Sequence, residues 1–242
     1  MKKTLLCASL MFTASVFATE QAPHWGYSGE NGPENWAKLT PEFGACTGKN
    51  QSPVNITGTI KADLKPLKFN YKAGESQILN NGHTVQVVYD AGSTVVIDGV
   101  EYNLKQFHFH APSENQITGK SFPMEGHFVH ADKDGNLAVV AVMYKEGKEN
   151  KALAKLWAHL PKEGEKIALT PAGNALDLLP QNHAYYRFNG SLTTPPCTEG
   201  VRWIVMKKPV FVSKSQIEAF KTIMEHDNNR PVQPANARTI LE

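Results

Sequence analysis

Three histidines lie in apolar, aromatic surroundings at a spacing that suits metal binding. His108 and His110 are two residues apart within residues 106–110, and His127 follows within residues 124–130. In a β-strand successive side chains point to opposite faces, so His108 and His110 share a face. The same alternation puts His127 on one face of its own strand and His130 on the other. The sequence therefore predicts that His108, His110 and His127 meet at one point.

Three neutral imidazoles are a ligand set that suits Zn²⁺ and leaves a fourth tetrahedral position for water. An open position is typical of a catalytic zinc rather than a structural one. The alternative is that each histidine is an ordinary half-buried side chain, the better interpretation for any one of them alone. Burying three such rings without partners would cost roughly 1–3 kcal/mol each, and a metal ion supplies all three partners. The triplet therefore favours a zinc site.

The amino terminus has the pattern of a secretory signal peptide. Lys2 and Lys3 precede an apolar run over residues 5–16, and Val16-Phe17-Ala18 has the small residues of a cleavage site. The run is too short to span a bilayer, so a membrane anchor is only the alternative. We expect residues 1–18 to be the signal peptide, cleaved after Ala18, and residues 19–242 to be one periplasmic or secreted domain.

The charge balance excludes partners that bind through a strong net charge. The chain has 25 basic and 23 acidic residues, and cleavage of the signal peptide removes two of the basic ones, Lys2 and Lys3. The mature chain is therefore close to neutral. Nothing in it predicts binding to nucleic acid or to acidic lipid.

Cleavage would also remove Cys7 and leave Cys46 and Cys197 as an even pair. In an exported protein such a pair indicates a disulfide. The alternative is two buried thiols, which an oxidising compartment disfavours.

The rest of the chain is mostly strand-like, with Asp98-Gly99 as a strong hairpin signal before the first histidine segment. Apolar residues recur at helical spacing over 152–160, before Pro161, and over 217–223, behind a capping-box pattern at 213–216. These patterns predict a mainly β single domain, a large and mostly antiparallel sheet with a few peripheral helices. The expected strands are 85–89, 94–97, 102–110, 126–131, 137–144 and 201–212.

The histidine segments and several other motifs together resemble the alpha-class carbonic anhydrases, and the cysteine pair and signal peptide resemble their exported bacterial members. The resemblance runs from residues 24–27 to residues 228–231, nearly the whole mature chain. It implies one twisted, mostly antiparallel sheet of ten strands, and a monomer or homodimer. It also suggests cis peptide bonds at Ser52-Pro53 and Pro195-Pro196. The motifs are Gln106–His110, Glu125–His127, Gln51–Ile56, Asn80–His83 and Gly190–Cys197.

The resemblance implies a zinc lyase, a carbonate dehydratase that reversibly hydrates CO₂ to bicarbonate and a proton. In carbonic anhydrases as a class, zinc lowers the pKa of its bound water to about 7, so that a zinc-bound hydroxide attacks CO₂ near neutral pH. The same nucleophile makes a side activity on simple esters chemically plausible.

Other residues are expected to hold the ligands in place, because a ligating imidazole usually donates its other N–H to an acceptor. By alternation Gln106 is placed to support His108, and Glu125 to support His127. The alternative is that both are exposed polar residues on an edge strand. The resemblance implies that a backbone carbonyl near Asn228 supports His110.

Thr193 and Glu114 resemble the pair that orients the nucleophile in the family. The threonine oxygen accepts a hydrogen from the nucleophile if its own hydroxyl donates to a fixed carboxylate. Taken alone, residues 193–196 are simply a turn. The resemblance also implies an apolar wall that binds CO₂, for which plain core packing is the alternative. The wall residues are Val129, Val139, Leu192, Thr194, Val201 and Trp203.

Turnover also requires a group that carries the released proton to buffer near neutral pH. His83 matches the proton shuttle of the resembled family, with Tyr27, Asn81 and Gln86 expected to hold the intervening waters. The alternative is that His83 is an ordinary turn residue after Asn81-Gly82.

Two other functions compete with this one. A cupin barrel also uses a His-x-His pattern followed by Glu, as in His108, His110 and Glu114, but Tyr102 and Ser121 stand where its glycines belong, and Gly126 directly abuts His127. A non-catalytic binding domain of the same family would be indicated by loss of a ligand, and all three histidines, Thr193 and Glu114 are present.

Overall fold

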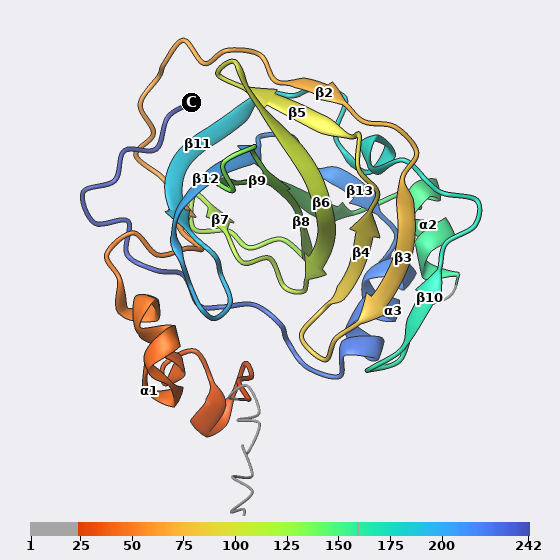
Figure 1. Ribbon diagram of the computed structural model, residues 1–242, viewed down its shortest axis with the longest axis horizontal. Helices are drawn as coiled ribbons and strands as arrows, with labels where there is room; N and C mark the ends of the chain where they lie inside the picture. Colours follow the sequence, from red (N-terminus) through yellow and green to blue (C-terminus); the bar gives the residue numbers. More distant parts are fainter. Residues whose placement is uncertain (1–23, 159) are drawn as a thin grey trace, which may run out of the picture.

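The computed structural model describes residues 24–158 and 160–242, and a large curved sheet dominates it (Figure 1). The expected signal peptide, residues 1–18, lies outside the described residues. The strands are β1 (Asn55–Ile56), β2 (Lys68–Asn70), β3 (Glu75–Asn80), β4 (Val85–Tyr89), β5 (Thr94–Ile97), β6 (Val100–His110), β7 (Gln116–Ile117), β8 (Met124–Ala131), β9 (Leu137–Glu146), β10 (Lys166–Ala168), β11 (Tyr185–Ser191), β12 (Glu199–Met206) and β13 (Val210–Val212). The α-helices are α1 (Trp36–Leu39), α2 (Lys151–Trp157) and α3 (Lys214–Met224), and the 3₁₀-helices are η1 (Gly29–Asn31), η2 (Pro41–Thr47) and η3 (Ala175–Leu178).

The main sheet is mixed, with antiparallel pairing over most of its width. Its central order is β10-β3-β4-β6-β8-β9-β12-β11, with β13 beside β9 and with β5 joining β2 to β6. Only β12 and β13 pair in parallel within this sheet, both with β9, in the part of the chain that the structure describes. The described sheet has eleven strands rather than the ten that the resemblance implied, and β2, β10 and β13 have only three residues each.

Local sequence signals explain most strand boundaries. Asp98 and Gly99 have φ values of 54° and 87° and join Ile97 to its partner Val100, as a tight turn with two left-handed residues requires. The strands expected at 85–89 and 94–97 are β4 and β5. The strand expected at 201–212 is divided instead. Residues 207–209 separate β12 from β13, and Pro209 has no N–H with which to continue a ladder.

Both predicted helices form, and one is shorter than expected. α2 ends at Trp157, before Leu160, because Pro161 lacks the N–H that would bond the Trp157 carbonyl. The Asn150 side chain accepts hydrogen bonds from the backbone of the first turn of α2. At the start of α3 the capping box between Ser213 and Gln216 is complete, as the sequence predicted.

The two faces of the sheet bury different clusters. Phe107 and Phe109 alternate with the histidines of β6 and belong to the main hydrophobic core, which α2 and α3 cover. Trp157 of α2 packs edge-on against Phe109, with ring centroids 5.0 Å apart. The histidines face the opposite side, where a smaller cluster surrounds Trp203. The alternation along β6 thus places its phenylalanines in the hydrophobic core and its histidines on the opposite face of the sheet.

The amino-terminal segment is tied to the loop after β11. Cys46 and Cys197 form the predicted disulfide, and both pack beside Trp36 in a third buried cluster. The peptide bonds Ser52-Pro53 and Pro195-Pro196 are cis, as the resemblance suggested. Among the described residues, none of the helices has the length and apolar character needed to cross a membrane.

Candidate metal centre

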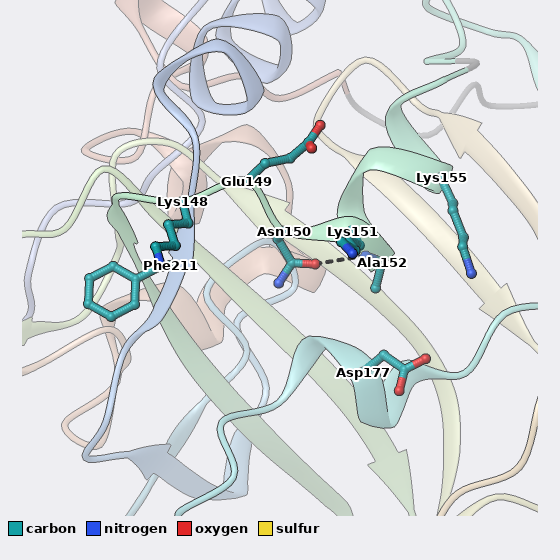
Figure 2. A pocket seen from close by; sticks show the side chains of 8 residues that line it. All are labelled: Lys148, Glu149, Asn150, Lys151, Ala152, Lys155, Asp177 and Phe211. Atoms are coloured by element: carbon teal, nitrogen blue, oxygen red, sulfur yellow. Dashed lines mark hydrogen bonds between the residues drawn. The ribbon is translucent and has the colours of Figure 1, made fainter.

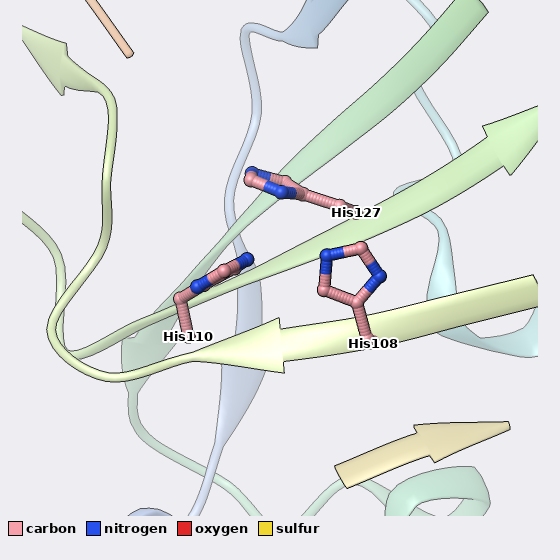
Figure 3. Close-up of side chains that lie close together, drawn as sticks. All are labelled: His108, His110 and His127. Atoms are coloured by element: carbon pink, nitrogen blue, oxygen red, sulfur yellow. The ribbon is translucent and has the colours of Figure 1, made fainter. Parts of the chain in front are cut away.

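The three histidines predicted as ligands converge on one point. His108 and His110 come from β6 and His127 from the adjacent β8, where His108 and His127 are direct cross-strand partners. One ring nitrogen from each lies within 4.8 Å of those of the other two. Figure 3 shows the rings turned toward one another from neighbouring strands. This spacing suits a single ion bonded to all three.

The second nitrogen of each ring faces an acceptor. His108 Nδ1 lies 2.8 Å from Gln106 Oε1, and His110 Nδ1 lies 2.7 Å from the Asn228 carbonyl. His127 Nε2 lies 3.0 Å from Glu125 Oε1. Because carbonyl oxygens only accept, the bonds of His108 and His110 place the protons on their outer nitrogens. The Glu125 carboxylate offers an acceptor to an Nε2 proton on His127. The lone pairs of His108 Nε2, His110 Nε2 and His127 Nδ1 remain for a ligand.

The inner atoms are suited to a cation. His110 Nε2 is buried and has no hydrogen-bond partner among the described residues. Burial lowers the pKa of all three imidazoles, and their mutual repulsion lowers those of His108 and His127 further. The rings are therefore neutral, the form that binds a metal. Three imidazole nitrogens fit Zn²⁺, which accepts nitrogen ligands in a tetrahedral arrangement.

Both carboxylate oxygens of Glu125 accept hydrogen bonds. Its Oε2 accepts the backbone N–H groups of Glu114 and Asn115, both at 2.8 Å, and its Oε1 accepts the Asn115 side-chain amide at 2.7 Å. Burial raises the pKa of Glu125 to about 7, and the bonds from Asn115 act in the opposite direction. The carboxylate that faces His127 is thus held by three donors. Nothing in the sequence analysis pointed to Asn115.

Glu114 lies beside the ligands and bonds to the carboxy-terminal segment. Its Oε1 accepts the Arg230 backbone N–H at 2.8 Å, and its Oε2 lies 3.6 Å from His110 Nε2. Burial raises the pKa of Glu114 to about 8, while bonds from the Arg230 backbone and the Thr193 side chain oppose that rise. A cation at the histidines would also favour the ionised form. The structure therefore places Glu114 beside His110 and His127, with the Thr193 side chain close to its carboxylate.

The loop that carries Thr193 is anchored from three directions. The Cys197 N–H donates to the Thr194 carbonyl at 2.8 Å, and the disulfide joins this loop to Cys46. The buried Arg230 guanidinium donates to Gln51 Oε1 at 2.7 Å and to the Cys46 carbonyl at 3.0 Å. Sequence reasoning missed this role of Arg230, although both motifs that it joins, residues 51–56 and 228–231, were recognised.

Most of the predicted apolar wall forms one cluster. Val139, Val201 and Trp203 are buried, and Val129 and Leu192 pack against them. The Trp203 ring stands edge-on to His127, with centroids 4.9 Å apart. The cluster thus adjoins the histidines, as a pocket wall requires. The sixth predicted wall residue, Thr194, is half-buried and lies outside this cluster.

The predicted proton path lies at the edge of the site. His83 is half-buried in the β3–β4 turn and stacks on Trp25, with ring centroids 3.7 Å apart. Gln86 is the cross-strand partner of His108. The Tyr27 hydroxyl is buried and has no hydrogen-bond partner among the described residues. The Asn81 side chain instead accepts the backbone N–H groups of His83 and Thr84, a bond pattern that shapes the turn.

Four hollows on the surface of the described residues contain none of these groups. Figure 2 shows one of about 350 Å³ beside α2 and η3, where the Asn150 side chain accepts the Ala152 N–H. None of its eight lining residues is a predicted site residue, and several are surface lysines, which makes it a solvated surface rather than a catalytic pocket. The lining residues are Lys148, Glu149, Asn150, Lys151, Ala152, Lys155, Asp177 and Phe211.

Comparison with known proteins agrees with this geometry. A family model described as eukaryotic-type carbonic anhydrase matches residues 31–242. The chain belongs to the alpha-carbonic anhydrases. It is 49% identical over 240 residues to a carbonic anhydrase of Pectobacterium carotovorum, a match that covers 98% of this chain and 96% of that one.

Solved carbonic anhydrases have the same fold. One, a hyperthermostable carbonic anhydrase from a hydrothermal vent chimney, is 57% identical, with a TM-score of 0.89 over 90% of this chain and 99% of that one. Another, the alpha-carbonic anhydrase of Thermovibrio ammonificans in complex with sulfanilamide, is 51% identical, with a TM-score of 0.90 over 92% and 100%. The mainly β, single-domain prediction is thereby confirmed, and the cupin alternative is excluded.

Proposed function

We propose that this alpha-carbonic anhydrase hydrates CO₂ reversibly to bicarbonate and a proton, with Zn²⁺ held by His108, His110 and His127. The observation that carries the proposal is the convergence of three neutral imidazoles within 4.8 Å. When bound, zinc supplies a water acidic enough to ionise near neutral pH, the property known for the family. Because all three donors are uncharged, they leave more positive charge at the site than thiolates or carboxylates would.

Thr193 and Glu114 orient the nucleophile in this proposal. In this proposal the Thr193 hydroxyl donates to Glu114 Oε2, which is buried and has no hydrogen-bond partner among the described residues, and the threonine oxygen then accepts a hydrogen only from the other side. The Arg230 N–H holds the second oxygen of Glu114, which keeps the acceptor in place. A nucleophile that donates to Thr193 then has a lone pair directed toward CO₂. Positioning of this kind contributes to rate because the reacting atoms must meet in one geometry.

The apolar cluster beside His127 supports a binding site for CO₂. CO₂ is small and accepts hydrogen bonds weakly, so a wall of hydrocarbon suits it better than polar groups. Val139 and Val201 are almost completely buried, and Trp203 donates its indole N–H to the Ser191 carbonyl at 3.0 Å, which leaves no donor directed at the wall. The wall residues also exclude water from one side of the site.

His83 carries the released proton from the site to buffer. It lies in the turn before β4 and is partly exposed, whereas His110 and His127 are buried. Burial is the largest cause that lowers its pKa, and the imidazoles of His24 and His226 lower it further. An imidazole is the side chain whose charge changes near neutral pH, so His83 is suited to accept a proton from the site and release it to buffer.

Export to the periplasm or outside the cell is the location that we propose. Residues 1–18 have the pattern of a signal peptide, which makes residues 19–242 the catalytic domain. The Cys46–Cys197 disulfide supports an oxidising compartment.

The test is metal content together with the rate of CO₂ hydration, measured by stopped flow with a pH indicator before and after chelation. We expect one zinc per chain, loss of hydration on chelation and recovery with added zinc. His110→Ala should lose both zinc and activity, whereas the control His183→Ala, in a histidine outside the site, should keep both. A protein that contains iron or manganese and has no hydration activity would contradict the proposal.

A further inference from the structure

A hollow of about 490 Å³ lies where α2, β10 and η3 meet, and none of the proposed metal-site residues lines it. Part of its wall is hydrocarbon: Leu156 comes from α2, Ile167 from β10, and Leu169 follows β10 directly. These three side chains belong to the main core or pack against it. Glu75, the first residue of β3, brings a carboxylate to the same hollow. The volume suits a small molecule, since ligand sites commonly measure about 300–1,000 Å³.

Glu75 is a buried acid without a basic group in contact with it. Only 6% of the residue is exposed. Within the part of the chain that the structure describes, its carboxylate bonds to the Gly173 backbone and forms no ion pair. Burial raises the pKa of Glu75 to about 7. A buried ionised carboxylate is costly unless a cation pairs with it, so a positively charged ligand would supply a partner that the neighbouring residues do not.

Gly173 fixes the carboxylate at the wall of the hollow. A Cβ built on Gly173 would lie 2.1 Å from Glu75 Oε2, so the absence of a side chain there makes room for the carboxylate. The Gly173 carbonyl also accepts the backbone N–H of Gly74 at 3.0 Å, which ties the loop to the start of β3. The acid is therefore already in position before a ligand arrives, which reduces the entropic cost of binding.

Asp177 and Lys155 bring charges of opposite sign to the same hollow. Both are exposed and line it, Asp177 from η3 and Lys155 from α2, and Figure 2 shows them at the neighbouring hollow that they share. Asp177 raises the pKa of Glu75 more than Lys155 lowers it. On β4, the cross-strand partner Tyr89 bonds through its hydroxyl to two backbone groups instead. Two carboxylates against one ammonium leave the hollow with a negative balance.

We propose that this hollow binds a small primary ammonium compound with an apolar chain, whose ammonium group pairs with Glu75 and whose chain lies against Leu156, Ile167 and Leu169. An ammonium group has three N–H donors and the charge that the carboxylate needs. The chain gains by covering hydrocarbon that faces water. An anion would be repelled by both carboxylates, and a neutral molecule would leave Glu75 unpaired. The site is separate from the metal centre and does not depend on the proposed function.

The test is isothermal titration calorimetry of the zinc-loaded protein with hexylammonium chloride at pH 8. Hexanol has the same chain without the charge, and ammonium chloride has the charge without the chain. We expect one hexylammonium per protein chain. Each of the other two probes should bind at least about tenfold more weakly, because a hydrogen bond to a charged group, or the burial of several CH₂ groups, contributes that much.

Substitutions around the hollow should change the affinity in opposite directions. Glu75→Gln should weaken hexylammonium binding by about 10–100-fold. Asp177→Asn should weaken it and Lys155→Gln should strengthen it, each by about two- to fivefold, as expected for exposed charges. The control Asp134→Asn, in the β8–β9 turn, should leave it unchanged. His110→Ala should also bind hexylammonium normally, which would exclude coordination of the amine by zinc.

The pH dependence supplies an independent readout. Hexylammonium stays charged at neutral pH, since its pKa is close to the value of about 10.4 for lysine. Binding should therefore weaken by about tenfold from pH 8 to pH 6, as Glu75 becomes protonated, and this dependence should disappear in Glu75→Gln.

Equal affinity in Glu75→Gln, or no hexylammonium binding at concentrations up to about 10 mM, would overturn the inference. Loss of binding in His110→Ala would do the same, because it would place the amine at the metal centre. If Glu75→Gln does not fold, the other two substitutions decide the question, since a loss of structure would weaken binding in both and could not strengthen it in Lys155→Gln.

Discussion

Glu125→Gln is the substitution whose effect on metal binding follows most directly from the structure. Both carboxylate oxygens face donors: two backbone N–H groups at Oε2, and the Asn115 amide with His127 Nε2 at Oε1. A glutamine has one oxygen and one NH₂ group, so in either orientation its NH₂ faces donors. Asn115 cannot turn to help, because its Oδ1 already accepts the Val54 N–H at 3.1 Å.

Two costs follow from this conflict. An unsatisfied buried donor costs about 1–3 kcal/mol of stability. If the new NH₂ faces His127, the ring must change tautomer, which moves its proton to the inner nitrogen and removes a ligand lone pair. Loss of a partner of this kind typically weakens metal binding by about 10–100-fold, equivalent to about 1.4–2.7 kcal/mol.

The assay is competition for zinc with a chromophoric chelator at pH 7.5, with urea denaturation of the zinc-free protein measured in parallel. We expect zinc affinity to fall by about 10–100-fold and stability to fall by about 1–3 kcal/mol. Glu218→Gln, at an exposed position of α3, is the matched control and should change neither. A variant whose zinc affinity stays within threefold of the original would refute the idea that Glu125 fixes the His127 tautomer.

Three further predictions test the proton path, a buried carboxyl group and the disulfide. His83→Ala should slow hydration in weak buffer but not in strong buffer, and added imidazole should restore the rate, as stopped-flow measurements would show; an unchanged rate would remove His83 from the proton path. Burial, with a smaller effect of Asp177, raises the pKa of Glu75 to about 7. The stability that the protonated Glu75 contributes is fully present below its ordinary pKa of 4.5 and is lost as the pH rises through 7. Glu75→Gln should therefore lose less stability than the original protein between pH 4.5 and 8, by about 1–3 kcal/mol in urea denaturation, and equal losses would contradict this assignment. Cys46→Ser with Cys197→Ser should lower the free energy of unfolding by about 2–5 kcal/mol, because the bridge closes a loop with a sequence separation of 151, and reduction of the original protein with dithiothreitol should reproduce that loss.

The sequence predicts the site well where chemistry depends on local alternation. His108 and His110 had to share a face once β6 was recognised, and the hairpin signal at Asp98-Gly99 set the strand that carries them. The choice of His127 over His130 followed from the same period. His130 indeed lies in the opposite face, where its Nε2 is 2.5 Å from the Tyr71 hydroxyl in the main core.

Contacts between segments that are distant in the sequence could not be predicted from such local patterns. Asn115 and Arg230 hold the two buried glutamates through backbone and side-chain bonds, and neither has a pattern that distinguishes it from an ordinary polar residue. α2 ends before Pro161, and Pro209 separates β12 from β13, in each case because proline has no backbone N–H to donate. Both prolines can be recognised in the sequence. The ten strands that the resemblance implied are one fewer than the eleven of the described sheet, and the three-residue strands β2, β10 and β13 have too few residues to show a period in the sequence.

The bond between His110 and the Asn228 carbonyl has a consequence for how the protein matures. These partners are 118 residues apart, and Arg230, just beyond, secures both Glu114 and the Cys46 segment. A nascent chain whose three ligand histidines have already left the ribosome therefore still lacks the Asn228 carbonyl that aligns His110. We therefore expect competence for metal only when residues 228–230 have been made and have folded back, so that a product terminated before residue 228 would contain every ligand and yet bind zinc poorly.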